Sequence, residues 1–269
     1  MTSLVPRLPA HAVSTVHQFL RAHALANGLE GVVVGLSGGI DSALVARLAV
    51  DALGPTRVFG VLLPDARYPS ELRTETEAYA RSLGIASRVV EIEPAVEAFR
   101  ALLPDVRDRV ALGNVAARVR MIVWYALARE RRALVAGAGN KSELLLGYFT
   151  KYGDGGVDLL PIGDLYKTEV WELAEALGIP EPIRTRAPTA GLWEGQTDEE
   201  ELGLPYRTID RILRGLEELR GAAEIARRTG IPEAAVDAIG RRVQANRHKR
   251  RTPPIPKLSL RTVGIDWRD

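Results

Sequence analysis

The stretch Gly35-Leu36-Ser37-Gly38-Gly39-Ile40-Asp41-Ser42 indicates both the fold class and a ligand. It follows the run Val32-Val33-Val34, whose β-branched residues are typical of a buried parallel strand. It precedes a run of strong helix formers that extends to Leu53. A strand, a Ser/Gly turn and a helix start together form an anion site, because free backbone N–H groups point outward where the helix dipole is positive. The stretch therefore predicts a bound phosphate or pyrophosphate.

Asp41 indicates what accompanies the phosphate. The turn contains no lysine, so it is not a Walker A loop, and its glycines do not follow the G-x-G-x-x-G order of dinucleotide-binding turns. A carboxylate beside a phosphate repels it unless a cation lies between them, so Asp41 predicts Mg²⁺. The alternative is an ordinary strand–helix turn with a capping serine, but two glycines, two hydroxyls and an acid in one turn favour the phosphate site.

Composition limits the class of protein. The 269 residues are 46% hydrophobic, enough to bury a large core, and we expect a single domain over 1–269. A formal net charge of +2 is too small to indicate nucleic-acid binding. Cysteine is absent, which excludes cysteine nucleophiles and thiolate metal sites and fits a reducing cytoplasm. We find no 18-residue apolar stretch, so we expect no membrane contact.

Strands and helices alternate along most of the chain. We expect an N-terminal helix over about 10–27 and then an α/β core over about 30–180. The predicted strands lie at 31–36, 57–63, 87–92 and 132–137, and the predicted helices at 41–53, 69–83, 114–131 and 167–177. This alternation predicts an α/β fold with a doubly wound, Rossmann-like parallel sheet, in which ligands bind beyond the carboxyl ends of the strands.

Two further segments break this alternation. The segment 147–164 is rich in Gly and Asp and is predicted to be a functional loop. A helical C-terminal part is expected over about 195–246, beginning at a capping box at Thr197, with helices at 206–218, 221–229 and 232–246. The basic tail 247–269 cannot be helical past its prolines.

The loop 35–42 resembles the pyrophosphate-binding loop of the N-type ATP pyrophosphatases, which cleave ATP between its α and β phosphates. A second block, from Gly137 to Val170, resembles the NAD synthetases nearly residue for residue, and especially their ammonia-dependent form. Blocks at 114–121, 187–192 and 248–250 resemble that family in the same order, so the similarity spans about 30–262. The resemblance implies an adenine nucleotide alpha hydrolase type of fold. It also implies ATP-dependent amidation of deamido-NAD by ammonia, through an acyl-adenylate, to give NAD, AMP and pyrophosphate.

The resemblance also implies which residues bind ATP and metal. The ATP-binding positions are Gly35, Leu36, Ser37, Gly38, Gly39, Ile40, Asp41, Ser42, Ala138, Lys167 and Thr189. Asp41 and Glu143 match the carboxylates that hold Mg²⁺ in the family. The alternatives are that Glu143 is a helix-start acid paired with Lys141, that Lys167 is a surface lysine, and that Thr189 is a turn residue.

Five residues match positions that hold deamido-NAD in the family: Arg118, Lys151, Asp158, His248 and Lys249. The alternative is that they are solvated charges of a helix, a loop and a basic tail. Asp154 matches the position thought to hold ammonium or accept its proton, although it could be an ordinary turn aspartate. The expected catalytic set is thus Asp41, Glu143, Asp154 and Lys167.

The family also works as a homodimer with the deamido-NAD site across the interface. The apolar stretch from Met121 to Leu127 is compatible with an interface helix or with a core helix. This chain departs from the family in having Ala138 where many relatives have threonine, and its segment 64–70 matches the adenosine-contacting stretch only weakly.

Three other functions share one or more of these motifs. A tRNA-modifying enzyme with the same loop, such as a lysidine synthetase, would need a strongly basic face. A non-catalytic ATP-binding regulator would have little use for the acids at 41, 143 and 154. An oxidoreductase would need the third glycine that the half fingerprint at Gly137 and Gly139 lacks. Because glutamine hydrolysis in two-domain relatives uses a cysteine, and these 269 residues have none, we expect direct use of ammonia.

Overall fold

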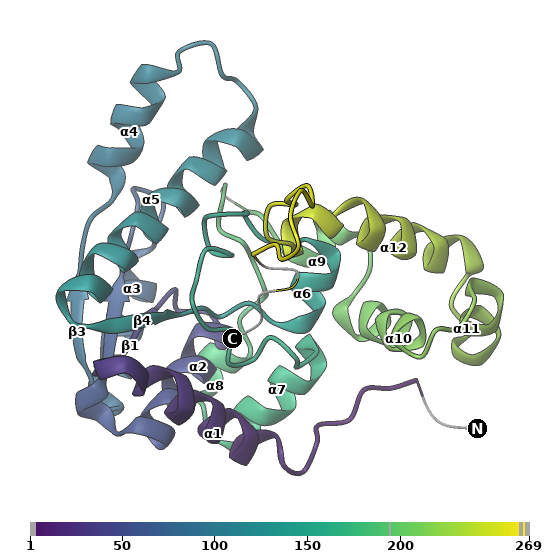
Figure 1. The fold of residues 1–269 in the computed structure, drawn as a ribbon, viewed down its shortest axis with the longest axis horizontal. Coiled ribbons are helices and arrows are strands. Elements are labelled where there is room, and N and C mark those ends of the chain that lie inside the picture. Colours follow the sequence, from purple (N-terminus) through teal and green to yellow (C-terminus); the bar gives the residue numbers. More distant parts are fainter. Residues whose placement is uncertain (1–3, 194, 264–265, 267–269) are drawn as a thin grey trace.

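The computed structural model describes residues 4–193, 195–263 and 266. The parts of the expected tail at 264–265 and 267–269 lie outside the described residues. Four strands form one sheet in the order β3-β2-β1-β4, and every pair is parallel (Figure 1). Their bounds are β1 Gly31–Gly35, β2 Val58–Leu62, β3 Ala86–Val89 and β4 Ala133–Ala136. The predicted doubly wound parallel sheet is confirmed.

Helices cover both faces of this sheet. One face packs on α1 (Ala12–Ala24), α2 (Ile40–Leu53), α3 (Ser70–Ser82) and α7 (Lys167–Ala176), and the other on α4 (Glu93–Leu102) and α5 (Arg109–Glu130). Successive residues of β1 point to opposite faces, with Val32 and Val34 in the first core and Val33 in the second. This explains why β1 is apolar throughout rather than alternating.

The strand order places a ligand site at a defined point. From β1 the chain moves outward to β2 and β3, then crosses back to place β4 on the other side of β1. The strand order therefore reverses at β1, where the carboxyl ends of β1 and β4 lie side by side. This is where open parallel sheets bind ligands.

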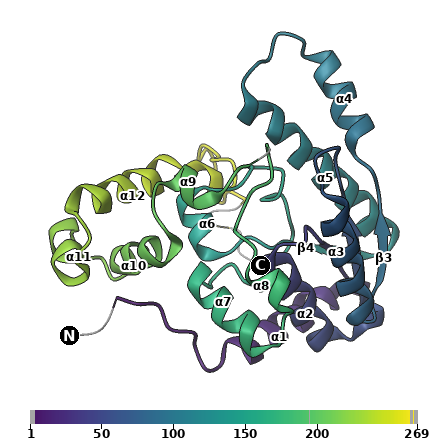
Figure 2. The ribbon, with the colours of Figure 1, turned by 180° about the vertical axis from the view of Figure 1, so that it is seen from behind.

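The helices of the C-terminal part form a lobe to one side of the sheet and its covering helices (Figures 1 and 2). Its core brings α6 (Lys141–Leu146) together with the later helices. These are α9 (Asp198–Leu202), α10 (Tyr206–Glu217), α11 (Ala222–Thr229) and α12 (Glu233–Ala245), with a short α8 (Glu181–Arg184) before them. Three short 3₁₀ turns lie at Ala26–Gly28, Pro55–Arg57 and Arg247–Arg250. The chain is irregular from Arg251, before the prolines, as predicted.

The expectation that no stretch is long and apolar enough to cross a membrane needs correction at α5. It is the one helix in the described part of the chain that is long and apolar enough, with a mean hydropathy of 1.3, to cross a membrane. Its centre, however, carries Arg118 and Arg120, and it packs against β1 and β4. Length and composition are therefore weak evidence here, because a helix of an α/β layer passes the same test.

Candidate functional site

A large pocket opens at the carboxyl ends of β1 and β4. Its volume is about 1110 Å³, and its lining comes from the loop after β1, the segment after β2, the start of α6, the segment 147–154 and the loop before α9. Every residue that was assigned to ATP or to catalysis lines this one pocket. The residues concerned are Gly35, Leu36, Ser37, Gly38, Gly39, Ile40, Asp41, Ser42, Ala138, Glu143, Asp154, Lys167 and Thr189.

The loop after β1 is held in shape by its own hydroxyls. The Ser42 hydroxyl donates to the Gly39 carbonyl at 3.0 Å and accepts from the Ser37 backbone N–H at 3.2 Å. The Ser37 hydroxyl in turn accepts from the Gly39 N–H at 3.2 Å. Gly38 has φ +79°, and a Cβ there would lie 2.4 Å from Leu72, so only glycine fits. The turn 37–42 thus stands, in a fixed shape, at the start of the 14-residue α2, where helix N–H groups can bind an anion; we call it the anion cradle.

Three charged side chains from separate elements meet beside this cradle. Lys167 Nζ, at the start of α7, lies 2.5 Å from Asp41 Oδ2 and 3.3 Å from Glu143 Oε1. The lysine side chain is only 2% exposed, whereas the two carboxylates are 17% and 16% exposed. Lys167 is therefore not a surface lysine. It bridges the two acids, which stand at the starts of α2 and α6.

The electrostatics of this trio depend on burial and on one another. Burial by itself lowers the pKa of Lys167, but Asp41 and Glu143 outweigh it, and the pKa is raised above that of a free lysine. Burial raises the pKa of Glu143, while Lys167 lowers it and Asp41 raises it again. On balance the pKa of Glu143 is raised, so Lys167 stays charged while protonation of Glu143 is favoured.

Asn140 is a site residue that sequence reasoning missed. It is fully buried, its Nδ2 donates to Asp41 Oδ1 at 2.9 Å, and its Oδ1 accepts from the Glu143 backbone N–H at 3.0 Å. The Glu143 carboxylate completes a capping box by accepting from the Asn140 N–H at 3.3 Å. One side chain thus fixes both acids. The signal in the sequence was an asparagine followed three residues later by glutamate.

Asp198 is a second residue that was missed. It is 3% exposed, lines the pocket, and accepts from the Tyr206 hydroxyl at 3.1 Å through Oδ2. Burial raises its pKa, and the charge of Lys167 opposes that rise. Its only sequence signal was the capping box, and Thr197 does cap α9 by accepting from the Glu200 N–H.

The acids fit a magnesium ion that is shared with a phosphate. No group of three or more His, Cys, Asp or Glu side chains in the described part of the chain could hold a metal by itself. Mg²⁺, however, commonly takes only one or two protein carboxylates and completes its shell with water and substrate phosphates. Asp41 and Glu143 supply such a pair of oxygen donors beside the anion cradle.

Asp154 lies in the wall of the same pocket. Its Oδ1 accepts from the Thr150 backbone N–H at 2.8 Å, and its side chain opens onto the cavity although protein atoms surround it. Desolvation raises the pKa of Asp154, while the Thr150 hydrogen bonds and the charge of Lys249 oppose the rise. An acid with this environment can hold a small cation or accept a proton more readily than a free aspartate.

The residues assigned to deamido-NAD lie mostly outside the pocket. Only Lys249 lines it, and its Nζ donates to the carbonyls of Gly147 at 2.7 Å and Phe149 at 3.0 Å. Lys151 Nζ donates to the His248 carbonyl at 2.9 Å, and Arg118 donates to the Lys151 carbonyl at 3.3 Å. Arg118, Lys151 and His248 are therefore neighbours, beside α5.

Asp158, the fifth of these residues, has a structural role within the chain. Its Oδ1 accepts from the Tyr125 hydroxyl at 3.0 Å and its Oδ2 from the Val135 backbone N–H at 2.8 Å. Both carboxylate oxygens are thus engaged, one by α5 and one by β4.

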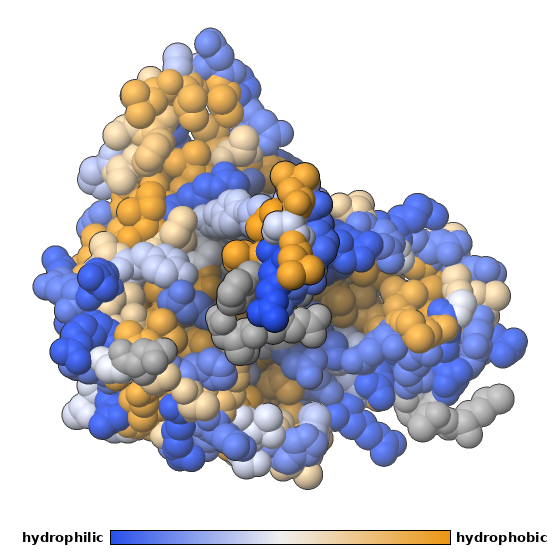
Figure 3. Space-filling model, in the orientation of Figure 1, coloured by the Kyte–Doolittle hydropathy of each residue, from blue (hydrophilic) through white to orange (hydrophobic). Residues whose placement is uncertain are grey.

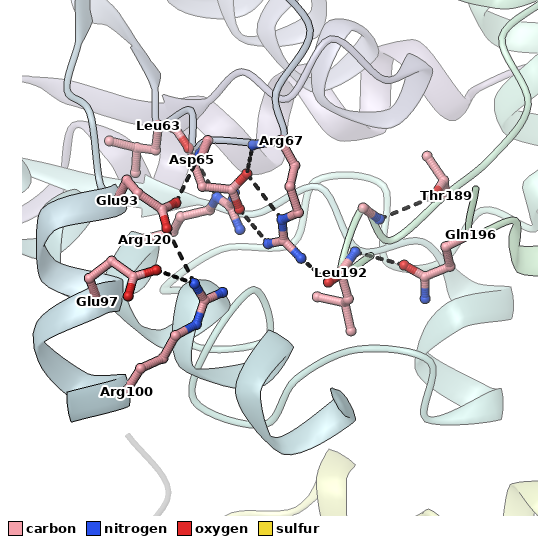
Figure 4. Close-up of polar contacts among 12 residues, drawn as sticks. Leu63, Asp65, Arg67, Glu93, Glu97, Arg100, Arg120, Thr189, Leu192 and Gln196 are labelled. Carbon is pink, nitrogen blue, oxygen red and sulfur yellow. Dashed lines mark hydrogen bonds and ion pairs between the residues drawn. The ribbon is translucent and has the colours of Figure 1, made fainter. Parts of the chain in front are cut away.

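The weakly matching segment 64–70 forms an ordered part of the pocket. Figure 4 shows Asp65 between two arginines: Arg67 lies 2.5 Å and Arg120 3.1 Å from Oδ2. Although burial raises the pKa of Asp65, the Arg67 hydrogen bond and both positive charges hold it below the usual value. Arg67 also donates to the carbonyl of Leu192, which ties this segment to the loop before α9.

The loop before α9 is tied to the anion cradle at its other end. Arg186 donates to the Gly38 carbonyl and pairs with Glu75 of α3. Between these ties lies Thr189, which is exposed and accepts from the Gly191 N–H at 3.0 Å (Figure 4). The loop therefore crosses one side of the pocket and brings Thr189 to it.

The sequence as a whole is similar to a known family. A family model described as NAD synthase matches residues 12–253. The NH(3)-dependent NAD(+) synthetase of Methanosarcina acetivorans is 47% identical over 250 residues, which cover 92% of this chain and 98% of that protein. The enzyme of the same name from Pyrococcus horikoshii is 44% identical, covering 94% and 96% of the two chains.

Solved structures agree. An NMN synthetase from Francisella tularensis superposes with a TM-score of 0.82 at 34% identity, covering 93% of this chain and 99% of that one. An NH3-dependent NAD synthetase from Campylobacter jejuni superposes with a TM-score of 0.78 at 32% identity, covering 91% and 97%. The fold, the pocket at the sheet's switch point and these similarities together show that the chain belongs to the NAD synthase family.

Proposed function

We propose that this protein is an ammonia-dependent NAD synthetase that converts deamido-NAD, ATP and ammonia into NAD, AMP and pyrophosphate. The observation that carries the proposal is the meeting of Asp41, Glu143 and Lys167 beside an anion cradle. Asp41 lies in the block 35–42, and Glu143 and Lys167 lie in the block from Gly137 to Val170; both blocks resemble the family. The pocket takes its lining from both the α/β core and the C-terminal helices, so we treat residues 1–269 as one catalytic unit.

Activation of the substrate acid is the first chemical requirement. A carboxylate is a poor acyl donor, because ammonia would have to expel oxide from an anion. In the proposed reaction the carboxylate oxygen of deamido-NAD bonds to the α-phosphorus of ATP, and the bond from that phosphorus to the oxygen bridging to the β-phosphate breaks. Pyrophosphate then leaves into the cradle formed by 37–42, while the charge of Lys167 stabilises the developing negative charge on the phosphoryl oxygens.

Asp41 and Glu143 would hold Mg²⁺ in this scheme. The ion, when bound, supplies positive charge that offsets the phosphate charge. Asn140 orients both carboxylates, which keeps their oxygens on the pocket side of the cradle. Ala138 and Thr189 flank the nucleotide in the proposal, and Ala138 gives no hydroxyl where many relatives have one.

Amide formation is the second step. The nitrogen of ammonia bonds to the acyl carbon, the bond from that carbon to the AMP oxygen breaks, and the nitrogen loses a proton. We assign Asp154 to this step: its carboxylate would gather ammonium and take up the released proton. The raised pKa of Asp154 suits a group that accepts a proton.

A homodimer accounts for the residues that lie outside the pocket. Hydrophobic side chains gather over α4 and α5 (Figure 3), and the exposed ones are Phe99, Leu102, Leu103, Val110 and Ile122. Arg118, Lys151, Asp158 and His248 lie beside this same helix α5. We propose that a second copy covers this apolar surface and that deamido-NAD binds across the interface. We also place the enzyme in the cytoplasm, with no nucleic-acid or membrane partner.

The test is NAD formation by the purified protein from deamido-NAD, MgATP and an ammonium salt, with AMP and pyrophosphate released in equal amounts. Nicotinic acid mononucleotide replaces deamido-NAD in a parallel assay, because a solved relative is called an NMN synthetase. Faster amidation of the mononucleotide would refute the assigned substrate, and nucleotide cleavage that requires tRNA would refute the reaction. Turnover with glutamine equal to that with ammonium would refute the nitrogen source.

A further inference from the structure

Asp210 is a fully buried acid on α10 that lies outside the pocket lining. Its Oδ1 accepts from the Ser142 hydroxyl at 2.5 Å. Its Oδ2 accepts from both the backbone N–H and the hydroxyl of Thr168, at 2.9 and 2.8 Å. Three donors from two other helices thus converge on one carboxylate.

Ser142 extends this contact to the reactive lysine. While it donates to Asp210, the Ser142 hydroxyl accepts from the Lys167 backbone N–H at 2.9 Å. A hydroxyl has one proton and two lone pairs, so it can serve both partners. Asp210 therefore fixes the first two residues of α7 and the second residue of α6, and the next residue of α6 is Glu143.

We propose that Asp210 is a positioning residue that sets the distance between Lys167 and Glu143. Each of these side chains projects from a helix start that Asp210 holds, directly or through Ser142. The inference rests on the proposed function, because the consequence of misplacement is a slower reaction at the phosphate. Through Asp210, the C-terminal helix α10 would then set the geometry of the site, although the reacting groups stand on α2, α6 and α7.

The carboxylate cannot be replaced by an amide without loss. In Asp210→Asn the amide NH₂ either faces the Thr168 N–H, where two donors cannot bond to each other, or faces Ser142, whose hydroxyl proton then loses its acceptor. Burial raises the pKa of Asp210 on balance, and the hydrogen bonds from Ser142 and Thr168 oppose this rise because they favour the ionised form.

The experiment compares Asp210→Asn and Thr168→Val with Thr168→Ser, which keeps the hydroxyl. Pyrophosphate release is measured in a single turnover with deamido-NAD and MgATP before ammonium is added. We expect Asp210→Asn to slow this step about 10–100-fold, since a displacement near 1 Å at a reacting group can cost ~10²-fold. Thr168→Val should slow pyrophosphate release less than Asp210→Asn does, and Thr168→Ser should release pyrophosphate at the wild-type rate. The KM for ammonium should stay within about twofold of the wild-type value in each variant.

Ile212→Val is the matched control, because it removes one methyl group from a fully buried residue of the same helix without touching the network. If Asp210 only stabilises the fold, Asp210→Asn will release pyrophosphate no more slowly than Ile212→Val does for an equal loss of Tm. That result would overturn the inference. Thr168→Val serves if Asp210→Asn does not fold, and an unchanged rate in that variant would also overturn it. Absence of NAD formation by the wild-type protein would refute the proposed function itself, and this inference with it.

Discussion

Replacing Lys167 by methionine removes the cation between two acids and keeps the length of the side chain. Asp41 and Glu143 are mostly buried, and Lys167 bridges them at 2.5 and 3.3 Å. Breaking a buried ion pair by removing one partner costs about 3–5 kcal/mol. Because both carboxylates open onto the pocket, we expect the lower end, about 3 kcal/mol. For a chain of this size that corresponds to a fall in Tm of about 6–12 °C.

The second part of this prediction concerns how much Mg²⁺ stabilises the variant and the wild type. If Asp41 and Glu143 hold the ion, Mg²⁺ stabilises the folded protein, by about 2.7 kcal/mol at a concentration of 100 Kd. The variant should gain more from Mg²⁺ than the wild type does, because Lys167 repels the ion. Its kcat/KM should nevertheless fall about 10²–10³-fold, since the phosphoryl oxygens lose a cation.

Thermal unfolding with and without magnesium chloride measures both effects. Lys141→Met is the control, since Lys141 pairs with Asp164 and Glu217 outside the pocket and should not alter the response to magnesium. A Lys167→Met protein that melts at the wild-type temperature without metal would refute the buried bridge. An equal gain from Mg²⁺ in both proteins would refute the assignment of the two acids to the metal.

Three further predictions concern separate parts of the molecule. Asp154→Asn should chiefly raise the KM for ammonium, and a full ammonium titration that is unchanged would remove its assigned role. Asp65→Asn should destabilise the fold by about 3–5 kcal/mol at neutral pH, because the largely buried Arg120 loses its ion-pair partner and keeps the hydrogen bond to the Leu63 carbonyl. The pKa of Asp65 is lower in the folded protein than in the unfolded chain. The stabilisation by the Asp65 carboxylate is therefore complete above about pH 4 and is lost as the pH falls through the pKa of Asp65 in the folded protein. Urea unfolding of the wild type and the variant at several pH values should show the difference in their free energies of unfolding becoming smaller at low pH. A difference that stays constant with pH would contradict the prediction. Ile122→Asp should give a monomer with weakened deamido-NAD binding. The control Leu219→Asp, at an exposed position of the C-terminal part, should leave the mass of the protein in solution unchanged. Light scattering measures that mass, and a dimeric Ile122→Asp protein would exclude α5 from the interface.

Local patterns predicted the sheet and most of the helices. The anion cradle was found because a β-branched strand, a Ser/Gly turn and a helix start are adjacent in sequence. The helix 93–102 was missed, and α5 begins at Arg109, five residues before the predicted start at Asn114. The start of α5 is fixed by Asp108, whose side chain accepts from the Ala111 N–H at 2.7 Å, and this cap was overlooked.

The rest of the site depends on contacts between distant segments. Asn140 meets Asp41 across 99 positions of sequence, and Asp210 meets Ser142 across 68. No local pattern reveals such pairs. The same limit applies to Lys249, which was expected to bind substrate and whose amine donates to two carbonyls of its own chain. Its role in holding deamido-NAD stays a prediction.

Asp158 has a consequence for the free edge of the sheet. β4 ends the strand order, and an edge strand offers unpaired N–H and C=O groups to any passing chain. Here Asp158 accepts the Val135 N–H, and the Asp158 and Leu159 N–H groups both donate to the Val135 carbonyl. The middle of that strand is thereby closed to intermolecular β-pairing. The Asp158 carboxylate thus covers a strand edge that could otherwise pair with another chain.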